Sequence, residues 1–181
     1  MVAPAAAMLA WVLVEAAHTR KVTLVGACTG VVTGLVAITP AAGFVDVWAA
    51  VVMGVVTAPI CYAAIAFLKP RFGCDDALDA FGCHTVGGIV GGLLTGVFCV
   101  PELSWTEVGG LFLYTGDPSL LVSQLLGILV TIAFVAVATL VIGFVLKAAF
   151  HGLRVDAREE GEGLDARQHG ESAYPSFNGL D

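Results

Sequence analysis

The chain has 181 residues, of which 58% are hydrophobic and 13% are charged. An ordinary globular domain contains about 25% charged residues, so this chain has too few polar side chains to cover a water-soluble fold. The abundance of apolar residues excludes a disordered chain, and the net charge of −7 disfavours a nucleic-acid binder, so the sequence predicts an integral membrane protein.

Five apolar stretches are interpreted as membrane-crossing helices, because a helix needs about 20 residues to span the hydrocarbon core. They are too long and too continuous for the strands of a membrane barrel. The residues that follow them include seven acidic and three basic side chains. The predicted fold is therefore all-α, with a transmembrane bundle at 1–150 and an acidic tail at 151–181. The predicted spans cover residues 2–17, 22–39, 47–68, 76–100 and 119–150.

The basic residues indicate how the spans are oriented. With five crossings, the loops after the first and third spans lie on the same side as the tail. Together with the end of the fifth span, these regions hold all eight basic residues: Arg20, Lys21, Lys69, Arg71, Lys147, Arg154, Arg158 and Arg167. The loops on the other side, 40–46 and 101–118, carry only acidic charges. The positive-inside rule therefore places the N-terminus outside and the C-terminal tail in the cytoplasm.

Two of the predicted spans carry glycines at every fourth position. Small residues at this spacing form a flat helix face, which lets two helix backbones approach closely within a membrane. The pattern predicts a tightly packed bundle, and these glycines are expected to serve packing rather than chemistry. They are Gly26, Gly30 and Gly34 in the second span and Gly88, Gly92 and Gly96 in the fourth.

His84 is the candidate functional residue of the fourth span. If Asp75 or Asp76 caps that helix, His84 lies about 12 Å along its axis. An ionisable residue at such a depth suggests a function, because a neutral imidazole both donates and accepts a hydrogen bond. The alternative is a buried histidine bonded to a neighbouring helix, and the sequence alone leaves both open. Ala80 lies one turn earlier on the same face and would leave room beside the imidazole.

The other polar residues have simpler interpretations. Asp79, in the first turn of the fourth predicted helix, fits a capping or dipole-compensating acid. Glu15 ends the first span beside a basic turn and is expected at the membrane interface. No catalytic triad, zinc site or phosphate loop is present in the sequence, so neither an enzyme nor a bound cofactor is expected. The cysteines lack C-x-x-C spacing. Cys74 lies in a polar loop, and the other four lie in apolar runs and are interpreted as small packing residues: Cys28, Cys61, Cys83 and Cys99.

Four sequence patterns occur in a recognisable order. They are LVGACTG at 24–30 with GLVAITPAAGFV at 34–45; DAFGCH at 79–84 with GGIVG at 87–91; LTGVF at 94–98; and GLRV, EGLD and HGESAY at 152–155, 162–165 and 169–174. Together they resemble the C-terminal part of the ammonium transporter family, which includes the methylammonium permeases and is related to the Rh proteins. The resemblance covers nearly the whole chain.

This resemblance implies a fold of eleven spans in two inverted halves, of which the chain would be the last five spans. It implies a multi-pass protein of the cell membrane, surrounded by lipid, that forms homotrimers with one ammonium pore in each subunit. His84 matches the second of two pore histidines, and Ala80 matches a pore-lining position. Asp79 matches an acid with a structural role at the start of the pore helix. A PII-type signal protein would dock at the cytoplasmic face.

The first half of the family pattern, including the partner histidine, the outer cation site and the phenylalanine gate, has no counterpart in these residues. We therefore expect a C-terminal, partial ammonium transporter subunit that transports ammonium or ammonia with His84 in its pore. The alternative is a non-conducting, truncated family member that acts as an interaction or regulatory membrane protein. The pore histidine favours the first hypothesis, and the missing half-pore beside an intact tail favours the second.

Overall fold

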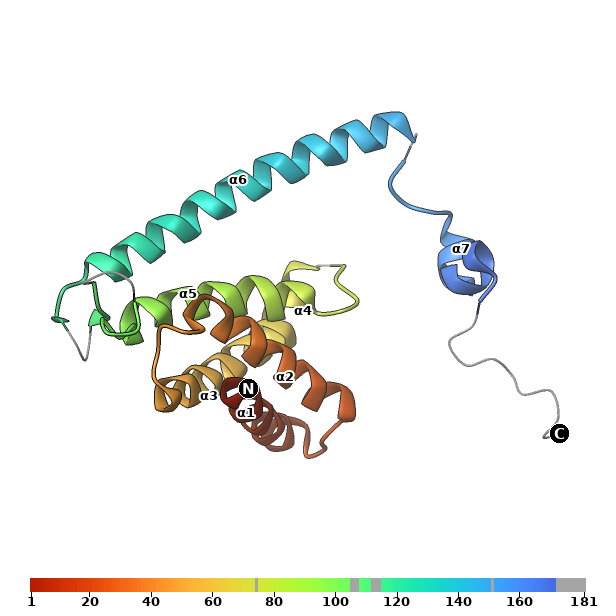
Figure 1. The fold of residues 1–181 in the computed structure, drawn as a ribbon. Helices are drawn as coiled ribbons and strands as arrows, with labels where there is room; N and C mark the ends of the chain where they lie inside the picture. The colour runs from red at the N-terminus through yellow and green to blue at the C-terminus, as the bar shows by residue number, and fades with distance from the viewer. Residues whose placement is uncertain (74, 105–107, 112–114, 151, 172–181) are drawn as a thin grey trace. The chain divides into compact units, whose positions relative to one another are not determined.

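The computed structural model describes residues 1–73, 75–104, 108–111, 115–150 and 152–171. Cys74 and the end of the tail pattern, 172–174, lie outside these residues. The described part of the chain is helical and contains no strand (Figure 1). The chain forms two compact units, Met1–Thr131 and Ile132–Asp181.

Most of the helices belong to the first unit, and α6 runs from the first unit into the second. Two of the long helices are extended by short helical turns, and the fourth span opens with such a turn (Figure 1). In chain order the elements are α1 Val2–Thr19, α2 Leu24–Ile38, η1 Thr39–Ala41, α3 Val47–Ala63, η2 Ala64–Leu68, α4 Lys69–Phe72, η3 Phe81–Val86, α5 Gly87–Phe98, α6 Ser119–Ala149, α7 Ala157–Glu162 and η5 Asp165–His169.

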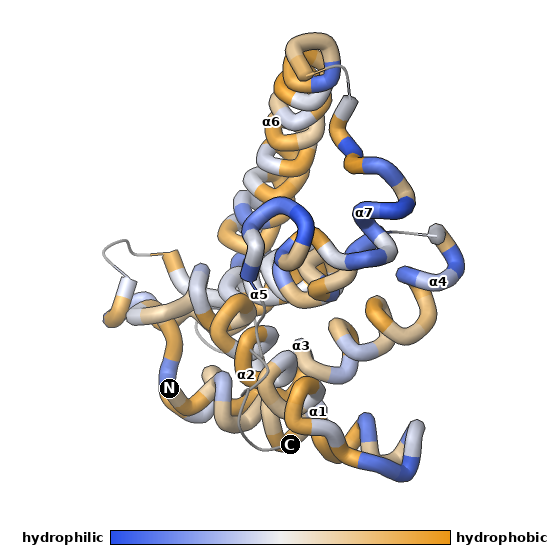
Figure 2. The backbone as a smooth tube through the Cα atoms, turned by 90° about the vertical axis from the view of Figure 1, so that its right-hand side faces the viewer, coloured by the Kyte–Doolittle hydropathy of each residue, from blue (hydrophilic) through white to orange (hydrophobic). Residues whose placement is uncertain are grey.

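Five helical stretches of the described chain are long and apolar enough to cross a membrane, which confirms the predicted number. The longest, α6, has 31 residues and a mean hydropathy of 2.9, and hydrophobic residues line most of it (Figure 2). A helix of this length exceeds the roughly 20 residues that an untilted span requires. The five stretches are Val2–Thr19, Leu24–Ala41, Val47–Phe72, Phe81–Phe98 and Ser119–Ala149.

The fourth span begins later than the sequence predicts. Residues 75–79 are not helical, and the helix starts at Phe81 rather than near Asp76. Asp79 has a φ of 56°, in the left-handed region, and a right-handed helix does not continue through such a residue. The Asp76 carboxylate instead accepts hydrogen bonds from the N–H groups of Ala80 at 2.9 Å and Phe81 at 2.8 Å. Asp76 therefore caps the helix from outside its first turn.

The glycines of α2 let this helix lie directly against α1. A Cβ atom on Gly30 would lie 2.7 Å from the Cβ of Trp11, and one on Gly34 would lie 2.6 Å from the Cα of Pro4. Real Cβ atoms do not approach other atoms this closely, so both positions require glycine. The core beside this contact consists of small residues around one indole: Ala7, Ala10, Trp11, Ala58 and Cys61.

The glycines of the fourth span pack in two directions instead of along one face. A Cβ on Gly91 would lie 2.4 Å from the Ala37 carbonyl oxygen, and one on Gly96 would lie 2.8 Å from the Cα of Leu121. α5 therefore packs against the end of α2 with one side and against the start of α6 with another. Gly88, which was expected in the packing face, has no atom of the described chain within 4 Å of an added Cβ.

The contrast between Gly91 and Gly88 gives the first prediction. We expect Gly91→Ala to destabilise the chain by about 1–3 kcal/mol, because the new methyl group must push α5 away from Ala37. Gly88→Ala is the matched control from the same helix and should unfold at the wild-type temperature or slightly above it. Thermal unfolding of the purified chain in detergent measures both variants. Equal unfolding temperatures for the two would contradict the close approach of α5 to α2.

Candidate functional site

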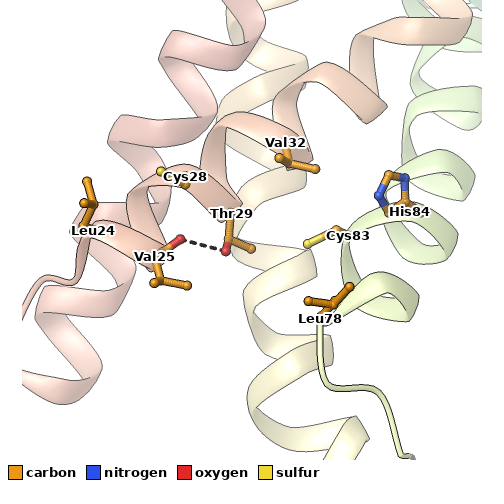
Figure 3. Close-up of a pocket in the computed structure, with 8 residues that line it drawn as sticks. All are labelled: Leu24, Val25, Cys28, Thr29, Val32, Leu78, Cys83 and His84. Atoms are coloured by element: carbon orange, nitrogen blue, oxygen red, sulfur yellow. Dashed lines mark hydrogen bonds between the residues drawn. The ribbon is translucent and has the colours of Figure 1, made fainter. Parts of the chain in front are cut away.

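A concave pocket of about 330 Å³ lies between α2 and the start of the fourth span. Residues of α2 form one wall, and residues at and just before the start of the fourth span form the other (Figure 3). The lining is mostly apolar, and His84 is its only ionisable side chain apart from two cysteine thiols. The lining residues are Leu24, Val25, Cys28, Thr29, Val32, Leu78, Cys83 and His84.

His84 is the fourth residue of η3, so it lies about 5 Å along the helix rather than the expected 12 Å. The difference follows from the late start of this helix. The side chain is exposed, and no residue of the described chain forms a hydrogen bond with its imidazole. Among the described residues, the imidazole therefore has no bonded partner on a neighbouring helix. One ring nitrogen of a neutral imidazole donates and the other accepts, so both capacities are open to a solute in the pocket.

The polar groups of α2 in this pocket offer few further hydrogen bonds to a solute. The Thr29 hydroxyl donates to the Val25 carbonyl at 2.8 Å, so its proton is already used within the helix (Figure 3). The Cys28 thiol is exposed. An apolar wall with one free donor–acceptor group favours a small solute that is polar but uncharged.

The structure separates the other two candidate residues from this pocket. Ala80 is the N-cap residue of η3, its N–H group donates to Asp76, and it is not among the lining residues. Leu78 lies in the pocket in its place. Asp79 lines a different cavity of about 230 Å³. Of the three candidates, His84 alone therefore reaches the pocket.

Sequence reasoning missed the α2 wall of this pocket. The sequence carries a pattern that could have predicted this wall, because the wall residues repeat at intervals of three or four positions and so share one helix face. The glycines at 26, 30 and 34 occupy another face, which packs on α1. Their positions exclude that face from lining the pocket of His84. The residues of the wall are Leu24, Val25, Cys28, Thr29 and Val32.

Asp79 has a different role from the expected first-turn acid. It precedes the helix, and its carboxylate pairs with the Lys69 ammonium at 2.7 Å. The two side chains are about 30% exposed, at 30% and 32%. The backbone carbonyl of Asp79 accepts from the N–H group of Cys83 at 3.0 Å, which begins the helical hydrogen bonds. The ion pair therefore ties the end of the third span to the residue from which the His84 helix starts.

Asp79 combines an ion pair with a left-handed backbone, and the two contributions can be separated. Asp79→Asn removes the charge but tolerates the left-handed conformation, so we expect a loss of at most about 1 kcal/mol. Asp79→Ala should lose about 1–2 kcal/mol more, because alanine is strained there. Thermal unfolding in detergent measures both variants. Adding Lys69→Gln to Asp79→Asn should cause no further loss, and a further loss would contradict the pairing.

The Asp76 cap predicts a pH dependence. Hydrogen bonds from the N–H groups of Phe81 and then Ala80 lower the pKa of Asp76 below its ordinary value of 3.8. A lowered pKa in the folded state stabilises the fold above the unfolded-state pKa, and this stabilisation is lost as the pH falls through the folded-state value. We therefore expect the unfolding temperature to decrease when the pH is lowered below about 4. Asp76→Asn keeps the shape of the side chain and should weaken this acid-dependent fall; an unchanged fall would contradict the assignment.

Comparisons with known proteins show the family of the chain. Residues 1–174 match the model of the Ammonium Transporter Family. The chain is 49% identical over 170 residues to a putative ammonium transporter of Methanothermobacter thermautotrophicus, which covers 94% of the chain and 41% of that protein. It is also 49% identical over 173 residues to the ammonium transporter of Aquifex aeolicus, covering 96% of the chain and 40% of that protein.

A solved structure shows the same fold. The chain superposes on the crystal structure of Saccharomyces cerevisiae Mep2 with a TM-score of 0.82 and 37% identity, over 98% of this chain and 40% of that one. The helices and the family match define a multi-span membrane protein of a transporter family, and the relatives are named as transporters rather than as enzymes, as expected. The chain belongs to the ammonium transporter family. It spans about two fifths of the length of the relatives it matches.

Proposed function

We propose that the chain supplies part of the wall of an ammonium pathway, as the C-terminal portion of an ammonium transporter subunit. The observation that carries this proposal is the open imidazole of His84 in the pocket beside α2. Family membership supports ammonium as the solute. In this proposal, His84 is a pore histidine and the apolar α2 face forms the opposite wall.

The chemistry of the pocket suggests the form in which the solute passes. A compact, strongly hydrated cation loses much of its solvation beside residues such as Leu24, Val25 and Val32, whereas neutral ammonia loses far less. Ammonia donates through its N–H groups and accepts through its lone pair, and a neutral imidazole matches both. We therefore propose that ammonium releases its proton before its nitrogen passes His84.

The orientation and assembly are further parts of the proposal. His18 accepts or donates a hydrogen bond with Tyr62 at 2.9 Å, and its ring contacts Phe67. The ends of the first and third spans therefore lie together, each beside a basic pair, which supports a cytoplasmic location for this end. We propose a multi-pass cell-membrane protein with its N-terminus outside, a bundle at 1–150 and a cytoplasmic tail at 151–181. A homotrimer and a PII-type partner at the cytoplasmic face rest on family membership alone.

The role of His84 can be tested in a chimera. The chain replaces the matching region of the Aquifex aeolicus transporter, in a host that lacks its own ammonium transporters. We expect His84→Ala to lower methylammonium uptake by about tenfold, the effect of losing one hydrogen bond of about 1.4 kcal/mol. Thr85→Ala, an exposed neighbour that does not line the pocket, is the matched control.

Two results would count against the proposed function. Uptake by His84→Ala within about twofold of the unmutated chimera, at equal amounts in the membrane, would exclude His84 as a pore residue. An unmutated chimera that inserts but does not transport methylammonium would favour the alternative, a non-conducting interaction or regulatory protein.

A further inference from the structure

A buried carboxylate near the end of α1 has no part in the pathway described above. Glu15, which the sequence predicts at the membrane interface, is buried within the bundle, with only 9% of the residue exposed. It lines the cavity of about 230 Å³ together with Trp11, Thr23 and Tyr62. An ionisable group inside a membrane-spanning helix is costly to keep there, so its partners indicate its role.

Thr23 is the hydrogen-bonding partner of this carboxylate. The Thr23 hydroxyl donates to Glu15 Oε1 at 2.8 Å, and the Thr23 N–H group donates to Oε2 at 3.3 Å. Thr23 is also the N-cap residue of α2, since its hydroxyl oxygen accepts from the Gly26 N–H group at 2.9 Å. The three residues form a chain of hydrogen bonds that runs from α1 to the first turn of α2.

Gly26 shows how closely the first turn of α2 lies against the carboxylate. A Cβ atom on Gly26 would lie 2.3 Å from Glu15 Oε2, so a larger residue here would displace the Glu15 carboxylate from its present position. The N-terminus of a helix carries a partial positive charge, which a nearby carboxylate stabilises. Contact, hydrogen bonding and electrostatics therefore all hold the start of α2 against Glu15.

The start of α2 also separates the two cavities. Val25 and Thr29 line both the Glu15 cavity and the pocket of His84. A displacement of this part of α2 would change the width of both at once. We propose that Glu15 is a positioning residue, which through Thr23 fixes the start of α2 and so the wall that faces His84. Its consequence for transport rests on the proposed function, but its consequence for the position of α2 does not.

Cysteine labelling of the full chain in membranes tests this role. Cys83 is buried against α2, where it accepts a hydrogen bond from Thr33 at 3.7 Å. Cys99 is buried elsewhere and serves as an internal control for unfolding. A maleimide reacts with each thiol at a rate that mass spectrometry of its peptide measures. Displacement of α2 should expose Cys83 and leave Cys99 protected.

Two variants break the link between Glu15 and Thr23 from opposite ends. Glu15→Ala removes the acceptor, and Thr23→Val removes the hydroxyl while keeping the shape of the side chain. We expect each to raise the labelling rate of Cys83 by about fivefold or more, with Cys99 unchanged. Thr23→Ser restores the hydroxyl and should restore protection. The exposed acid Glu102, changed to Gln, controls for the loss of a negative charge.

The double variant Glu15→Ala with Thr23→Val distinguishes one link from two independent effects. If both residues act through the same hydrogen bonds, the double variant should label Cys83 no faster than the stronger single variant. If the double variant labels Cys83 faster by the product of the two single increases, the proposal is overturned. Cys83 labelling at the wild-type rate in both single variants would overturn it as well. If Glu15→Ala exposes Cys99 as well, that variant has unfolded. The labelling rate of Cys83 in Thr23→Val then tests the proposal alone: a raised rate supports it, and the wild-type rate overturns it.

Uptake by the chimera completes the test. We expect Glu15→Ala and Thr23→Val to lower methylammonium uptake per inserted molecule, and Thr23→Ser to restore it. Labelling is measured on the chain itself, so a chimera that fails to transport leaves the labelling result standing. Wild-type protection of Cys83 in both variants overturns the positioning role whatever the uptake.

Discussion

The direct contact between the backbones of α1 and α2 is the constraint on which the first unit depends. It exists because Gly26, Gly30 and Gly34 have no Cβ atoms at the points where α2 lies closest to α1. In lipid, helices gain little from burying apolar side chains against one another, so close van der Waals contact must supply the stability. The same contact brings Thr23 to Glu15 and turns the opposite face of α2 toward His84. Packing and site geometry thus follow from one row of small residues.

Polar groups at the ends of the spans are arranged to satisfy one another. The Asp76 carboxylate accepts from two N–H groups at the start of the fourth helix, and Asp79 pairs with Lys69. Glu15 accepts from Thr23, and His18 is bonded to Tyr62. The Asp76 bonds fix the start of one helix, whereas the Asp79–Lys69, Glu15–Thr23 and His18–Tyr62 interactions join consecutive spans or the ends of two spans. They restrict how the helices can slide, which non-directional packing alone does not do.

The sequence predicted the features that depend on local pattern. Hydropathy was sufficient for five spans, and glycine spacing was sufficient for the α2 packing face, because both require only neighbours along one helix. It did not predict the start of the fourth helix, since any of three aspartates could have capped it. The choice of Asp76 depends on the left-handed backbone at Asp79 and on Lys69 from another span. The burial of Glu15 likewise depends on a tertiary partner, Thr23, and on a glycine one turn beyond it.

These partners also distinguish His84 from the acidic side chains near the helix ends of the first unit. Glu15, Asp76 and Asp79 have their carboxylates engaged by donors of the protein itself, so their charges hold helices in place. His84 has no such partner among the described residues, although it lies one helical turn from Ala80, which Asp76 caps. Under the proposed function, a capped helix start beneath a free imidazole would suit a small solute, because ordering the side chain then costs little when the solute binds. The Asp76 cap and the unpartnered ring of His84 would then act together in the pathway.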